Sequence, residues 1–265
     1  MRVFVEGVGL LGPGLNGWQA SRPLLAGDAA YAHRPTVVTA SELLPAAERR
    51  RTSLPVKLAL AAGRAAFVHS GRDAATTATV FTSSSGDGEN LHHICATLAS
   101  PEREISPTRF HNSVHNAPAG YWSIATRSHE SSTSLCCHDA SFAAGLLDAA
   151  VQVAVDGKPV ALIAYDQPYP EPLHTVRPIS ASFGMALVMA PQATGHVFAT
   201  LDISLVPGAA SATPMTDSGL DAVRAAVPAA RCLPLLAALA RGATAVVILA
   251  YGEQNHLRVE VAPWQ

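Results

Sequence analysis

The sequence has little charge and few cysteines. Only 14% of its 265 residues are Asp, Glu, Lys or Arg, and the formal net charge is −2. This balance excludes a strongly basic nucleic-acid-binding surface, and the hydrophobic content of 49% excludes an intrinsically disordered chain. The four cysteines have no CxxC spacing. We therefore expect no disulfide framework, no metal site and no cofactor.

Long hydrophobic runs are also absent. The apolar stretches near the C-terminus, CLPLLAALA and ATAVVILAYG, fall well short of the roughly 20 residues that cross a bilayer. At the N-terminus, Glu6 and Pro13 interrupt the apolar stretch too early for a secretory signal. We expect a cytoplasmic protein with no membrane span.

Predicted strands and helices alternate along the chain, which favours an α/β layered fold with a mixed sheet. We expect the segments 182–190 and 196–206 to form a hairpin. The predicted helix over 139–155 is apolar nearly all round, so we expect it to be buried between layers. The other predicted strands span 2–8, 75–84, 131–137, 159–167, 244–252 and 256–263, and the other helices span 45–69 with a break at Pro55, 89–100, 113–128 and 220–242, with a polar loop before 113.

Two short motifs are better explained by folding than by ligand binding. Gly7 to Gly12 read GxGxxG, but a dinucleotide site needs a helix to open at the motif, and Pro13 and Gly14 stand there. We expect a tight turn that leaves an edge strand. His111 and His115 have HxxxH spacing, but the predicted helix begins between them, so the spacing does not indicate a metal site.

The segment SLCCHDASFAAGLLDAA at 134–150 is a strand–turn–helix junction. A cysteine at a helix N-terminus has a lowered pKa, and backbone N–H groups at such a turn can hold an oxyanion. Cys136 and Cys137 are therefore candidates for a nucleophile. They are equally well explained as small hydrophobic side chains that close a strand.

Five segments occur in an informative order: VEGVGLLGPGLNGW, RRRTSLPVKLAL, SPTRFHNSVHNAPAGYWSIA, SLCCHDASFAAGLLDA and PISASFGMALVMA. Together they resemble the β-ketoacyl synthases, the condensing enzymes of the thiolase superfamily. The resemblance implies a thiolase-like layered fold with a buried central helix. It also implies a complete N-terminal half over 1–206 and a shortened remnant of the second half over 207–265, packed on the first.

The chain differs from that family at the positions of the family's catalytic residues. Aligning on Ser141 places His138 at the nucleophile position, with Cys137 one residue early. The family's two catalytic histidines have no counterpart, because neither an HGT-like nor an NxGH-like motif follows residue 207. This pattern resembles the truncated chain-length-factor-type subunits of aryl polyene clusters, which pair with a full-length ketosynthase.

The resemblance implies a non-catalytic partner of a type II polyketide or fatty-acid ketosynthase. Such a subunit shapes the acyl tunnel for polyene elongation on acyl carrier protein. We expect a heterodimer whose interface includes the strand 131–137 and the helix that starts near Val114. The candidate tunnel and interface residues are Arg109, Phe110, His115, Tyr121 and Trp122.

Two alternatives stay open. The chain could be an active acyltransferase or thioester hydrolase with Cys137 as nucleophile and His111 or His115 as base. It could also be a stand-alone small-molecule binding protein, which would be monomeric.

Overall fold

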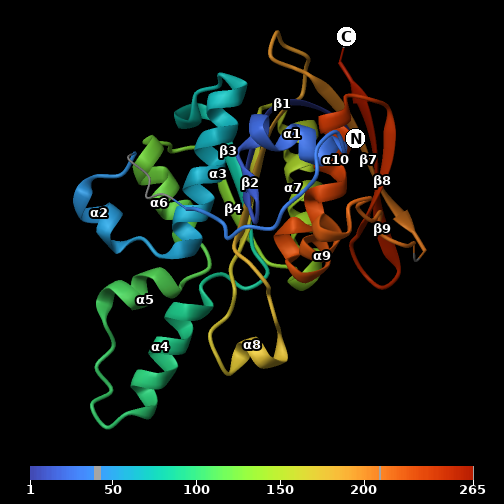
Figure 1. Ribbon diagram of the computed structural model, residues 1–265. Coiled ribbons are helices and arrows are strands. Elements are labelled where there is room, and N and C mark those ends of the chain that lie inside the picture. Colours follow the sequence, from blue (N-terminus) through green and yellow to red (C-terminus); the bar gives the residue numbers. More distant parts are fainter. Residues whose placement is uncertain (39–42, 209, 265) are drawn as a thin grey trace.

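A computed structural model describes residues 1–38, 43–208 and 210–264 (Figure 1). The described strands form one nine-stranded sheet in the order β4-β3-β5-β6-β1-β7-β9-β8, with β2 paired to β1. β3, β4 and β5 run parallel, and the other pairs are antiparallel, so the predicted mixed sheet is confirmed. The strands are β1 (Arg2–Gly12), β2 (Leu15–Asn16), β3 (Ala78–Thr82), β4 (Ser132–Leu135), β5 (Val160–Asp166), β6 (Phe183–Ala190), β7 (Ala199–Pro207), β8 (Ala245–Ala250) and β9 (Asn255–Pro263).

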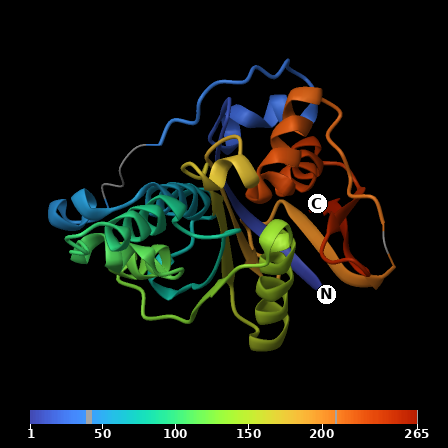
Figure 2. The same cartoon turned by 90° about the horizontal axis from the view of Figure 1, so that it is seen from below.

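Helices cover both faces of the sheet, as Figure 2 shows. α3 (Leu54–Ser70) and α6 (Ala117–Thr126) lie on one side. α7 (Ser141–Asp156) and α10 (Leu233–Arg241) lie on the other, where α10 packs on α1 (Trp18–Ala26). The predicted layered α/β fold is therefore confirmed.

The alternation of side chains along β5 explains why two separate cores form. Leu162 points into the core on the α7 side, and Ile163 points into the core on the α3 side. Every residue of β5 is buried because a central strand between two helix layers has no solvent face. α7 is buried along most of its length, but its last two turns expose Val151 and Val155.

The predicted hairpin of 182–190 and 196–206 is wrong, and so is the edge position of the first strand. β6 and β7 both pair with β1, which lies between them inside the sheet. The glycines of the GxGxxG motif lie within β1, and the first two admit α3: a Cβ atom at Gly9 would be 1.9 Å from the carbonyl oxygen of Ala62. The motif is therefore a site of close helix–strand packing.

Two helices form an arm that extends from the body below α3 and α6 in Figure 1. They are α4 (Gly88–Ala99) and α5 (Pro107–Ser113). The polar loop predicted before residue 113 is thus partly helical, because Ser106 caps α5 by accepting a hydrogen bond from the Arg109 N–H and Pro107 fills its first turn.

The predicted helix over 45–69 divides into α2 (Ala46–Arg51) and α3, close to the expected break at Pro55. The remaining α-helices are α8 (Leu173–Val176) and α9 (Ser218–Ala226). The 3₁₀ segments are η1 (Ala74–Thr76), η2 (His138–Ala140) and η3 (Pro228–Cys232). No helix in the described ranges is both long and apolar enough to cross a membrane.

Candidate functional site

The carboxyl ends of three parallel strands meet at one edge of the sheet, where ligand sites of α/β proteins commonly form. Ser83 and Ser84 follow β3, Cys136 follows β4, and Asp166 ends β5. Asp166 accepts hydrogen bonds from the N–H and hydroxyl of Ser84, at 2.9 and 2.8 Å, and from the N–H of Ala229 at 2.8 Å. The Cys136 thiol in turn donates to the carbonyl oxygen of Ser84 at 2.9 Å. Through Ser84, the buried carboxylate of Asp166 therefore fixes the start of the turn that follows β4.

Burial raises the pKa of Asp166, although the hydrogen bonds from Ser84, Ala229 and Ser83 oppose that shift. Asp166 is 3% exposed, and its partners come from the segment after β3 and from η3. Asp166 therefore has a structural task, which is to hold two strand ends and η3 together.

The turn after β4 has the strained backbone of a nucleophile elbow, and His138 stands at its apex. Its φ is +50°, a left-handed conformation that non-glycine residues adopt at a cost. The Ser141 hydroxyl closes the turn by accepting from the Cys137 N–H at 3.0 Å and donating to the His138 carbonyl at 2.7 Å. The His138 side chain is 70% exposed and lies just before the N-terminus of α7.

Among the described residues, the groups expected to assist a Cys137 nucleophile make other contacts. Its backbone N–H already donates to Ser141, so it is not free to hold an oxyanion. Of the two proposed bases, His115 Nε2 bonds the carbonyl of Leu135 at 2.9 Å, and the ring of His111 packs edge-on against Tyr121. In the part of the chain described, no hydrogen bond joins either imidazole to the Cys137 thiol.

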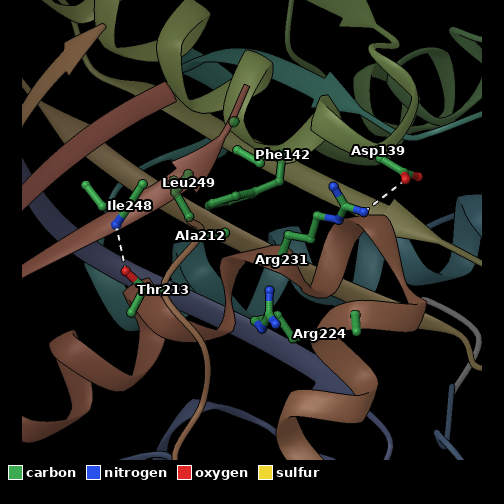
Figure 3. Close-up of a pocket in the computed structure, with 11 residues that line it drawn as sticks. Asp139, Phe142, Ala212, Thr213, Arg224, Arg231, Ile248 and Leu249 are labelled. Atoms are coloured by element: carbon green, nitrogen blue, oxygen red, sulfur yellow. Dashed lines mark hydrogen bonds and ion pairs between the residues drawn. The ribbon is translucent and has the colours of Figure 1, made fainter. Parts of the chain in front are cut away.

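Asp139 fastens the elbow to two other segments. One carboxylate oxygen accepts from Arg177 Nη2 at 2.8 Å. The other accepts from Arg231 Nη2 at 2.9 Å, the bond drawn to Asp139 in Figure 3. Burial alone would raise the pKa of Asp139, but the hydrogen bond from Arg177 and the charge of Arg231 outweigh it and hold that pKa below its usual value. The ionised carboxylate therefore joins the elbow to η3 and to the segment after α8.

A cavity of about 280 Å³ opens beside the elbow, between the first turn of α7, η3 and β8. Figure 3 shows Phe142 and Leu249 close together on one side and the guanidinium groups of Arg224 and Arg231 on another. The cavity's volume lies just below the usual range of small-molecule sites, about 300–1,000 Å³. Apolar side chains therefore line the cavity beside the elbow, and the positively charged groups of Arg224 and Arg231 lie at its rim.

The structure separates the five candidate tunnel residues into two groups. Phe110 is 63% exposed, and Arg109 on the same helix donates to Asn90 at 3.3 Å. Tyr121 and Trp122 are buried in this chain's own core, where Trp122 packs on Phe67 and Phe81. Those two side chains have no surface left with which to line a partner's tunnel, whereas Arg109, Phe110 and His115 keep theirs.

Sequence reasoning missed several residues that shape the site: Ser141, beyond its use as an alignment anchor, Asp139, Asp166, Arg177 and Arg231. Asp166 carried a usable signal, because a carboxylate at the end of an otherwise apolar strand needs buried partners. The two arginines carried none, since Asp139 and Arg231 are 92 positions apart in the chain.

Solved structures with this fold include ketosynthase complexes. One chain of "Ketosynthase (ApeO) in Complex with its Chain Length Factor (ApeC) from Xenorhabdus doucetiae" matches with a TM-score of 0.74 and 21% identity, over 98% of this chain and 99% of that one. A chain of "The ishigamide ketosynthase/chain length factor" matches with a TM-score of 0.75 and 13% identity, over the full length of both. At such identities the likeness shows the thiolase-like fold alone.

Sequence comparison identifies the family. No curated protein sequence matches the chain. The sequence profile described as "Beta-ketoacyl synthase, N-terminal domain" matches residues 18–255, which is most of the chain. The match contains the arm, the elbow and the cavity beside it. The chain therefore belongs to the β-ketoacyl synthase N-terminal domain family.

Proposed function

We propose that this chain is a non-catalytic, chain-length-factor-like partner of a full-length ketosynthase. The observation that carries the proposal is the residue at the elbow apex. His138 occupies the strained position, while Cys137 lies one residue earlier with its N–H already bonded to Ser141. An imidazole there cannot form the acyl thioester that a condensing enzyme needs.

The outer surface of the arm and of the neighbouring sheet edge supports a protein partner. β4 is the edge strand of the sheet, so one side of its backbone lacks a neighbouring strand among the described residues. Phe110, Val114 and Ile124 are exposed on α5, just after it and on α6. Apolar side chains in such number next to an open strand edge are typical of an interface.

In this proposal the arm reaches the partner's acyl tunnel, with Phe110 and Arg109 at its wall and His115 behind them. The bulk of Phe110 then limits how long an acyl chain fits, because forcing extra methylenes into a filled space costs about 1–3 kcal/mol. The matched structures described above are of ketosynthases with chain length factors. A further structure with this fold is "AntDE:AntF (apo): type II PKS acyl-carrier protein in complex with its ketosynthase bound to the hexaketide". We infer that this chain acts with a carrier-bound acyl chain, and the sequence resemblance favours a polyene.

The two-part division of the chain belongs to the same proposal. Residues 1–206 form the condensing-enzyme half and residues 207–265 form the shortened second half. The boundary falls at the end of β7, whose neighbours in the sheet are β1 and β9. The remnant therefore continues the sheet of the first half and closes the cavity beside the elbow through β8.

Co-expression with candidate ketosynthases tests the proposal. We expect this chain to copurify with one of them as a heterodimer, detected by the mass of the intact complex. Incubation with an acyl thioester should then acylate the partner and leave this chain unmodified. An acyl adduct on Cys137 that is lost in Cys137→Ala would support an acyltransferase or hydrolase instead. A monomer that copurifies with no ketosynthase would support a stand-alone binding protein.

A further inference from the structure

A second cavity, of about 650 Å³, lies between the α2–α3 junction and the arm. Apart from Leu54 and Pro168, its lining side chains are polar or charged. That composition does not suit an apolar acyl chain, because an apolar ligand would leave the polar groups around it without partners. Its volume lies in the range of small-molecule sites, about 300–1,000 Å³.

Two polar atoms of residues that line this cavity have no hydrogen-bond partner among the described residues. Asn112 is 4% exposed, and its amide nitrogen donates to the Arg51 carbonyl at 2.7 Å, but its Oδ1 is unpartnered. The Ser53 hydroxyl is also buried without a partner, although Ser53 stands at the N-cap of α3, where serine normally bonds a backbone N–H. Unpaired buried groups destabilise a fold, so both point to a ligand.

The charges around the cavity favour an anion. Three guanidinium groups line it, from Arg50, Arg51 and Arg109, against two carboxylates. Both carboxylates and two of the guanidinium groups have partners. Asp87 accepts from Asn90, and Glu89 pairs with His93 at 3.0 Å. Arg51 pairs with Glu48 at 3.4 Å, and Arg109 donates to Asn90 at 3.3 Å. Arg50 has no ion pair among the residues described, and guanidinium groups bind carboxylate and phosphate with paired hydrogen bonds.

The geometry points to a binding site for a small hydroxylated anion. The carboxylate or phosphate of the ligand binds Arg50 and the Ser53 hydroxyl, which acts as donor. A hydroxyl group of the same ligand donates to Asn112 Oδ1, which can only accept. This site is separate from the elbow and does not depend on a ketosynthase partner.

Titration calorimetry on the full chain tests the site, with glycerol 3-phosphate and malate as probes. We expect at least one of them to bind at a single site. Glycerol, which lacks the charge, and inorganic phosphate, which lacks the carbon-bound hydroxyls, should each bind at least about 10-fold more weakly, the equivalent of one lost charged hydrogen bond. Binding of one probe only would identify the anionic group as phosphate or carboxylate.

Three variants connect binding to the named residues. Ser53→Ala should weaken binding about 10-fold without loss of stability, because the hydroxyl makes no bond in the free protein. Arg50→Gln should weaken it by a similar factor and reduce its salt dependence. Arg64→Gln, an exposed arginine on α3 outside this cavity, is the matched control and should bind normally. The inference is overturned if neither probe binds at about 10 mM, or if Ser53→Ala and Arg50→Gln both bind like the wild type.

Discussion

The Ser141 hydroxyl donates to the carbonyl oxygen of His138 over 2.7 Å, and it is this bond that holds the apex of the elbow in its strained form. The same hydroxyl accepts from the Cys137 N–H, so one buried side chain fixes both ends of the turn. Together the two hydrogen bonds hold His138 at the apex of the turn.

Ser141→Ala should therefore destabilise the protein. Two hydrogen bonds are lost, each worth about 0.5–1.5 kcal/mol, so the free energy of unfolding should fall by about 1–3 kcal/mol. Urea denaturation measures the change. Ser113→Ala is the control: that exposed hydroxyl makes a single bond within α5, and its loss should change stability by less than about 0.5 kcal/mol.

His138→Gly should stabilise the fold or leave it unchanged. Glycine adopts a φ of +50° without the cost that a side chain incurs, and that gain exceeds or offsets the greater freedom of glycine in the unfolded chain. We expect a rise of up to about 1 kcal/mol in the free energy of unfolding. The same change at exposed His129, where φ is not positive, should destabilise. Equal losses at both positions would show that the elbow is not strained.

Asp139→Asn should change how stability depends on pH. The pKa of Asp139 is lower in the folded than in the unfolded chain, where it is near 3.8. Its contribution is therefore present above that value and is lost as the pH falls through the folded pKa. We expect a constant difference in stability between wild type and variant from pH 7 to about 5, shrinking toward pH 3. A difference that does not vary with pH would contradict the ion pairs with Arg177 and Arg231.

A second pH effect should come from His69 on α3. Burial lowers the pKa of His69, aided by the charge of Arg22, and its Nδ1 accepts the N–H of Val8 at 2.9 Å, which requires that nitrogen to be unprotonated. Below about pH 6.5 the unfolded chain takes up a proton that the folded chain resists, so stability falls as the pH drops.

His69→Phe removes both the titration and the acceptor. We expect it to be less stable than the wild type by about 1 kcal/mol at pH 7, with a shallower loss between pH 7 and 5. His129→Phe, at an exposed position, should keep the wild-type slope in urea denaturation across the same range.

Phe110→Asp should abolish copurification with the ketosynthase without unfolding the chain. The side chain is 63% exposed, so the charge costs little in the free subunit, but it would be buried unpaired in the complex. Val155→Asp is the matched control, since Val155 is 77% exposed in the last turn of α7, at the other end of that helix from the elbow. Retention of the complex in Phe110→Asp would place the interface elsewhere.

Local patterns in the sequence were sufficient for most elements. The apolar runs of β5 and β6, the break before Pro55 and the elbow junction are set by neighbouring residues, and the structure confirms them. The hairpin was wrong because adjacent strands in sequence need not pair: β1 supplies a long central strand that both β6 and β7 use.

The candidate site, too, could be predicted from the sequence only where neighbouring residues determine it. The position of His138 in the turn could be predicted from its spacing to Ser141, because both residues lie in one short turn. The ion pair of Asp139 with Arg231 and the burial of Tyr121 and Trp122 depend on how distant segments meet. The sequence analysis named Tyr121 and Trp122 as candidate tunnel and interface residues, and α6 turns both toward α3 and the sheet.

The most direct measurement is condensation by purified components on a carrier-bound acyl chain, run with the ketosynthase alone, this chain alone, and both together. The account predicts no product from this chain alone and the full elongated product only from the pair. It also predicts that Cys137→Ala has no effect on the pair. Condensation by this chain alone would contradict the account. Loss of the pair's activity in Cys137→Ala would contradict it as well.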